Sequence, residues 1–204
     1  MRKYIISVPM ICLLLLNACG ARQGKNEAVF EDFRRGLLDA AEVKTQAALD
    51  VTAGSTDAGY VLDVTWDGSE TVMEIRKPAL IAGVRAIARW GEGTVAYEGV
   101  MLGAGPIDGA GHTPVSAVPA ILDAMAGGYT ELLWREGDYL AARLYVEGNV
   151  RCTVWLEPES LIPAAAELSE DGTVLMTCTF SGWQVTAGTG KQNQESTLQD
   201  RERG

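Results

Sequence analysis

Apolar and polar residues alternate along most of the chain, and this period of two predicts an antiparallel β-sheet. Asp67-Gly68 and Asp171-Gly172 are strong turn signals between neighbouring runs. Short strands at such regular spacing are typical of an antiparallel meander. The predicted strands are 44–51, 60–66, 71–77, 131–135, 139–146, 150–156, 164–168 and 173–183, with weaker candidates at 81–87, 94–97 and 100–102.

Two segments depart from this alternation and follow a helical period. Residues 27–42 place Phe30, Phe33 and Leu37 on one apolar stripe, which predicts an amphipathic helix. Thr113-Pro114 is a good start for a second helix over 114–126, in which Pro119 predicts a kink or a later start.

The later strands have one apolar face and one largely polar face. Cys152 and Cys178 fall on the apolar face, with another predicted strand between them. Neighbouring strands lie about 4.8 Å apart, so two spacings exceed the usual reach of a disulfide. We therefore expect two buried free thiols. The predicted inward residues are Leu140, Ala142, Leu144, Val150, Cys152, Val154, Leu156, Val174, Met176, Cys178 and Phe180.

The first 18 residues have the layout of a secretory signal, with Arg2 and Lys3 ahead of an apolar run. That run, residues 4–16, is shorter than the roughly 20 apolar residues of a comfortable bilayer span. Leu16-Asn17-Ala18-Cys19 resembles the lipobox of bacterial lipoproteins, in which the cysteine is lipidated and the chain is cut before it. The resemblance implies a lipoprotein attached to the membrane through Cys19 and located outside the cytoplasm.

This reading divides the chain into four parts. They are a signal peptide over 1–18, a lipidated tether over 19–26, one folded domain over 27–186, and a polar tail over 187–204 that is predicted to be disordered. Two acyl chains hold a protein stably at a bilayer where one does not.

Net charge excludes one class of partner. The formal charge is −10, and it becomes −12 once Arg2 and Lys3 leave with the signal. Such a surface repels nucleic-acid phosphates and anionic headgroups, so we exclude nucleic-acid binding and expect the lipid to be the sole membrane contact.

No set of residues with a catalytic or metal-binding pattern stands out. His112 is the single histidine, which excludes a histidine-rich zinc site and favours a structural loop residue. The glycine-rich segment 103–111 contains no lysine and matches no phosphate-binding motif, so it is predicted to be a surface loop. We expect neither an enzyme nor a bound cofactor or metal.

Three stretches resemble the LolA/LolB/RseB superfamily of lipoprotein carriers and periplasmic sensors. They are VLDVTWDGSETVMEIRKP over 61–78, TVAYEGVML over 94–102, and VWLEPESLIPAAAELSEDGTVLMTCTFSGW over 154–183. The resemblance implies an α+β fold: an antiparallel β-sheet curved into an incomplete barrel, closed by an N-terminal helix and a central helix.

Such a fold suggests a binding protein that takes a hydrophobic ligand, a lipid or acyl chain, in a concave apolar cavity. Adaptable methionine and aromatic side chains suit such a site, although the same residues would equally fill a packed core. The cavity candidates are Leu62, Trp66, Met73, Ile75, Met101, Leu122, Met125, Trp134, Leu144, Val154, Met176 and Phe180.

The alternative function is a scaffold that holds or activates a cell-envelope enzyme. Exposed sheet edges and outward aromatic residues such as Tyr139, Tyr145 and Trp155 motivate it. A resemblance to LolA-like lipoproteins linked to sporulation and germination points to an enzyme of those processes as the partner.

Overall fold

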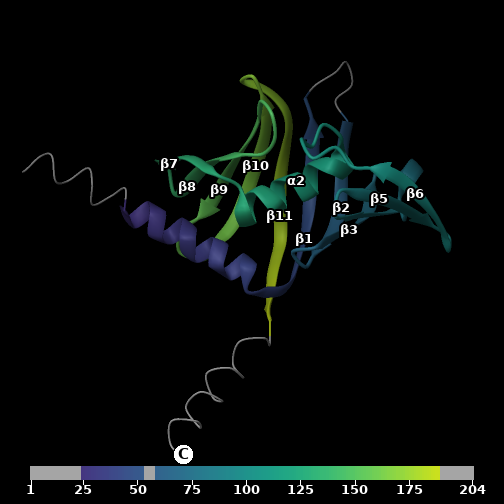
Figure 1. Cartoon of the computed structure of the whole chain (residues 1–204), viewed down its shortest axis with the longest axis horizontal. Helices are drawn as coiled ribbons and strands as arrows, with labels where there is room; N and C mark the ends of the chain where they lie inside the picture. The colour runs from purple at the N-terminus through teal and green to yellow at the C-terminus, as the bar shows by residue number, and fades with distance from the viewer. Residues whose placement is uncertain (1–23, 53–57, 189–204) are drawn as a thin grey trace, which may run out of the picture.

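A computed structural model describes residues 24–52 and 58–188, which form one α+β domain around a single curved sheet (Figure 1). The eleven strands are all antiparallel, in the order β6-β5-β4-β3-β2-β1-β11-β10-β9-β8-β7, and β6 and β7 are edges that do not meet. The predicted fold class, an antiparallel sheet forming an incomplete barrel, is therefore confirmed. The strands are β1 (Ala40–Val51), β2 (Ala58–Trp66), β3 (Glu70–Lys77), β4 (Arg85–Arg89), β5 (Glu92–Tyr97), β6 (Val100–Pro106), β7 (Thr130–Glu136), β8 (Tyr139–Tyr145), β9 (Val150–Glu157), β10 (Ile162–Glu170) and β11 (Thr173–Ala187).

Pairing between the first and last strands joins the two halves of the sheet. β1 runs antiparallel to β11, with Ala47 opposite Phe180 and Leu49 opposite Cys178. Each half is a meander of hairpins, so the chain must cross from the β6 edge to the β7 edge between them. Helix α2 (Pro114–Gly127) makes this crossing and lies across the curved sheet, in contact with β1, β4, β8, β9 and β10 (Figure 1).

Helix α2 is buried on most of its surface, because the sheet curves around it. Thr113 and Ser116 form a capping box that satisfies backbone N–H groups at the helix start. The helix runs without interruption from Pro114 through Pro119, so the predicted late start does not occur.

A second helix, residues 24–38 and called the N-terminal helix below, packs Phe30, Phe33 and Leu37 into the same core. The helix predicted over 27–42 is too long, because β1 begins at Ala40. Pairing of β1 with both β2 and β11 supplies backbone hydrogen bonds that outweigh the local helical pattern.

The cysteines lie as predicted. Cys152 on β9 and Cys178 on β11 are buried free thiols, and β10 separates their strands. Burial raises the pKa of Cys178 to about 12 and that of Cys152 further still, so both thiols are unreactive at neutral pH.

One predicted loop is wrong, and several predicted features lie outside the described residues. Residues 103–106, expected in a loop, extend β6 instead. The predicted signal peptide, Cys19 and the tail beyond residue 188 lie outside the described residues. Within the described parts of the chain, no helix is both long and apolar enough to cross a bilayer.

Candidate functional site

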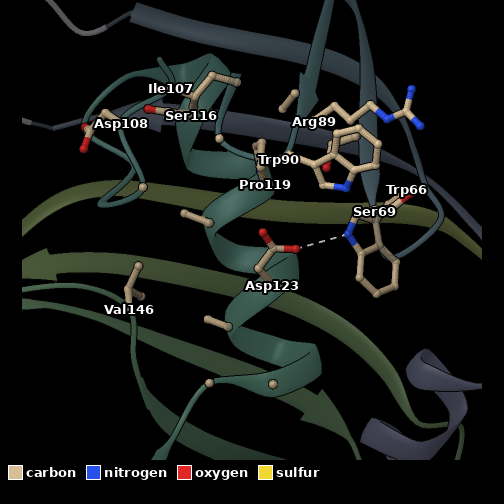
Figure 2. Close-up of a pocket in the computed structure, with 18 of the residues that line it drawn as sticks. Trp66, Ser69, Arg89, Trp90, Ile107, Asp108, Ser116, Pro119, Asp123 and Val146 are labelled. Carbon is tan, nitrogen blue, oxygen red and sulfur yellow. Dashed lines mark hydrogen bonds between the residues drawn. The ribbon is translucent and has the colours of Figure 1, made fainter. Parts of the chain in front are cut away.

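A cavity lies beside α2, between the helix and the ends of two hairpins (Figure 2). Its volume is about 560 Å³, within the range of small-molecule sites, roughly 300–1,000 Å³. Five segments line it: the β2–β3 turn, the β4–β5 turn, the loop before α2, one face of α2, and the end of β8.

Small side chains on α2 create the space. Ser116, Pro119, Ala120, Asp123 and Ala124 recur at intervals of three or four residues, so they share one helix face. Four of the five extend little beyond the backbone. The sheet therefore cannot close onto this face as it does onto the faces that carry Ile121, Leu122 and Met125.

Two tryptophans form the opposite wall. Trp66, at the end of β2, is buried, whereas Trp90, in the turn between β4 and β5, is 77% exposed. Trp90 has a φ of 51°, a left-handed conformation that is unusual for a bulky residue. The guanidinium of Arg89 lies 4.1 Å from the Trp90 ring centroid. The fold thus keeps a large aromatic side chain at the rim of the cavity (Figure 2).

Asp123 projects from α2 towards Trp66 (Figure 2). The indole Nε1 of Trp66 donates a hydrogen bond to Asp123 Oδ1 at 3.3 Å. Desolvation raises the pKa of Asp123, and the hydrogen bond from Trp66 opposes the shift only in part. The carboxylate is nonetheless accessible from the cavity and is its most distinctive polar group.

The loop before α2 is held by Asp108, which also lines the cavity. Its carboxylate accepts hydrogen bonds from the backbone N–H groups of Ala110 and His112, and it lies 2.6 Å from His112 Nδ1. His112 Nε2 is 3.5 Å from Glu170 Oε2 on β10. The single histidine therefore joins the loop to the sheet, and the described residues contain no group of three or more potential metal ligands.

The twelve cavity candidates occupy three kinds of position. Met101 is exposed on β6, and Trp134 is half-buried on β7, where its Nε1 donates to Glu136. Trp66 alone among the twelve lines the large cavity. Ten candidates, Trp66 included, pack in the continuous core: Leu62, Trp66, Met73, Ile75, Leu122, Met125, Leu144, Val154, Met176 and Phe180.

Sequence reasoning missed Trp90, Ala120 and Asp123. A helical projection of 114–127 would have shown small residues on one face, which is a signal for space beside a helix. The local sequence gives no signal that this face lies opposite Trp90, because that arrangement depends on how α2 crosses the sheet.

No family model matches this sequence, and no curated protein matches it significantly. Solved structures that resemble the chain include LolA superfamily and lipoprotein-sorting proteins, as the sequence resemblance predicted. An uncharacterized conserved protein from Thermus thermophilus shares 12% identity at a TM-score of 0.48, covering 80% of this chain and 89% of that one. A LolA superfamily protein from Nitrosomonas europaea shares 10% identity at a TM-score of 0.44, covering 81% and 95%.

A third similar structure is a complex of the CwlD amidase with the GerS lipoprotein from Clostridioides difficile. The match has 13% identity and a TM-score of 0.43, and it covers 78% of this chain and 94% of that one. With TM-scores below 0.5, none of these likenesses assigns a ligand or partner to this chain.

Proposed function

We propose that this protein is a lipid-anchored extracytoplasmic binding protein that holds the apolar chain of a lipid-like ligand beside α2. The observation that carries the proposal is the cavity of about 560 Å³ between the small-residue face of α2 and the two tryptophans. Apolar walls with a few polar groups are characteristic of small-molecule sites. Trp90 offers an exposed flat apolar surface at the rim, Trp66 closes the wall behind it, and the methyl and ring carbons of Ala120, Ala124 and Pro119 offer the facing wall.

The proposed site lies beside α2 and not at the centre of the barrel. Leu122 and Met125 of α2 belong to the same buried core cluster as Leu144 and Met176 of the sheet, so the centre supports the fold. A ligand chain fits beside the helix without displacing this core.

Competition with a fluorescent probe tests the proposal. The lipidated protein would be placed in phosphatidylcholine nanodiscs, and a neutral dansyl-labelled octyl probe would be displaced by octanol, with empty nanodiscs as background. Ala120→Leu would fill part of the cavity and weaken probe binding about tenfold or more, whereas Ala41→Leu, at an exposed position on β1, would leave it unchanged.

The absence of saturable probe binding to the native protein would overturn the proposal. Equal loss of binding in Ala120→Leu and Ala41→Leu would also contradict it, because a specific cavity must distinguish the two positions. Circular dichroism of each variant establishes that the fold is retained.

A second candidate, a partner-binding scaffold, is favoured by an asymmetry between the two sheet edges. β6 carries no charged residue, and Val100, Met101 and Leu102 are all more than half exposed. β7 carries Glu131 and Arg135, and such charges prevent strand pairing at an exposed edge. In this candidate function, a cell-envelope or sporulation and germination enzyme adds an extended segment to β6.

Site-specific photo-crosslinking in intact cells tests this second candidate. A crosslinker at Met101 would capture one envelope protein, and Leu102→Lys would abolish the product because it places a charge on the edge. Leu132→Lys, at an exposed position on β7, is the matched control and would leave the product intact. A homodimer product, or no product, would rule out the enzyme partner.

A further inference from the structure

Three charged side chains line the cavity, and their partners differ. The Asp108 carboxylate is occupied by two backbone N–H groups and His112. The Arg89 guanidinium stacks on Trp90, and its Nε lies 3.9 Å from Glu70 Oε2. Asp123 accepts a single hydrogen bond from the described residues, the long one from Trp66. An ionised carboxylate has about four acceptor sites, so most of the capacity of Asp123 is unused.

Asp123 lines the cavity, and one of its carboxylate oxygens faces Trp66 (Figure 2). Asp123 is exposed, and no basic side chain of the described residues forms an ion pair with its carboxylate. Arg89 extends away from Asp123 and does not neutralise it (Figure 2). A negative group on an otherwise uncharged helix face is thus available for a ligand to pair with.

The tryptophans beside Asp123 favour the same kind of ligand group. An indole face attracts a cation within about 6 Å of the ring centroid. Arg89 covers one face of Trp90, while Trp66 is fixed in place by burial and by its hydrogen bond to Asp123. Because Trp66 presents its N–H edge to Asp123, the indole surface open to a positive group in the cavity is the face of Trp90 that Arg89 leaves uncovered.

We infer that Asp123 selects amphipathic ligands whose polar end is a protonated amine and whose apolar chain lies along α2. This inference rests on the proposed binding function and narrows its ligand class. An ammonium group forms charge-assisted hydrogen bonds with a carboxylate, which are roughly twice as strong as neutral ones. A hydroxyl can form only a neutral bond there, and a carboxylate on the ligand is repelled.

Three eight-carbon probes that differ only in the polar end test the inference. Calorimetric titration of the lipidated protein in phosphatidylcholine nanodiscs, at pH 8 and corrected for empty nanodiscs, would compare octylamine, octanol and octanoate. Octylamine is expected to bind about tenfold more tightly than octanol, a difference of about 1.4 kcal/mol. Octanoate is expected to bind most weakly.

Asp123→Asn separates the charge from the shape of the side chain. The asparagine oxygen can still accept the Trp66 hydrogen bond, so the helix and the tryptophan keep their places. The variant is expected to bind octylamine no more tightly than octanol, with octanol affinity unchanged. Asp138→Asn, at an exposed turn position outside the cavity, is the control and should preserve the preference.

The outcomes distinguish this inference from the function on which it rests. Equal binding of octylamine and octanol, or a preference that survives Asp123→Asn, would overturn the amine selectivity and leave chain binding intact. Failure of all three probes to bind would overturn both.

Discussion

At the scale of single residues, the structure gives the only histidine a mechanical role. His112 lies between Asp108 on its own loop and Glu170 on β10, and each of the three side chains is roughly 40% exposed. The hydrogen bond with Asp108 is the largest influence and raises the pKa of His112 above its usual 6.5. Desolvation is the largest single influence on Asp108, but the combined hydrogen bonds from His112 and Ala110 lower its pKa.

This arrangement predicts a stability difference that depends on pH. Because the folded-state pKa of His112 is raised, the ion-pair stabilisation is fully present below about pH 6.5 and is lost as pH rises through the raised pKa. His112→Gln should therefore destabilise the protein more at pH 5.5 than at pH 8.5. The difference should stay below about 1 kcal/mol, because the groups are solvent-screened. Urea unfolding at both pH values measures it, and an equal or larger loss at pH 8.5 would contradict the assignment.

Trp90 predicts a conflict between stability and binding. A non-glycine residue in a left-handed conformation costs about 1–2 kcal/mol, and Trp90 is followed by Gly91, which also has a positive φ. Trp90→Gly should relieve this cost and leave stability unchanged or raised by up to about 1 kcal/mol, after the greater freedom of glycine in the unfolded chain is subtracted. The same variant should weaken binding of the octyl probe. Strong destabilisation in urea would show that the Arg89 stacking on Trp90 holds the turn.

At the scale of secondary-structure elements, the two helices support each other through one arginine. Arg34 on the N-terminal helix donates to the carbonyl oxygens of Met125 and Gly128, at the end of α2. The last carbonyl groups of a helix lack partners within it, so a guanidinium there both bonds them and complements the helix dipole. Desolvation lowers the pKa of Arg34, while Glu31 opposes the shift.

Arg34→Ala should lower the free energy of unfolding by about 1.5–3 kcal/mol, the usual worth of a hydrogen bond to a charged group. Arg35→Ala is a matched control on the same helix. Its exposed pair with Asp32 is worth less than about 1 kcal/mol. Chemical unfolding of both variants measures the contrast, and equal losses would mean that Arg34 does not cap α2.

Secondary-structure elements could be predicted from the sequence where the residues that determine them lie close together along the chain. The hairpins were predictable because turn residues such as Asp171-Gly172 and period-two patterns lie within a few residues of each other. Helix α2 was predictable from Thr113 and Pro114 for the same reason. The end of the N-terminal helix was not predictable, since the start of β1 is determined by distant strands: Val43 pairs with Trp66, 23 residues further on, and with Val185, 142 residues further on. Arg34 gave no local signal either, because its partners are 91 and 94 residues further on.

At the scale of the whole molecule, the order of the sheet determines where a ligand can bind. Because β1 and β11 are central, α2 must cross the concave side to connect the outer strands β6 and β7. Bulky residues of α2 then fill the centre, and only its small-residue face leaves space. An inward-facing apolar pattern predicts the twelve cavity residues, but such a pattern identifies a core and does not show which part of it stays open.

Location is the remaining property of the whole molecule, and we propose that a lipid on Cys19 determines it. The helix that follows the tether begins by residue 24 and is packed into the core, so at most about five residues at roughly 3.5 Å each separate Cys19 from the folded domain. Cys19→Ala should move the protein from the membrane fraction to the soluble envelope fraction, because two acyl chains are lost. Cys12→Ala, in the same predicted signal peptide, is the control and is expected to leave the protein in the membrane fraction. Detergent phase partition of labelled cells measures both, and retention of Cys19→Ala in the detergent phase would mean that something other than this lipid holds the domain close to the bilayer.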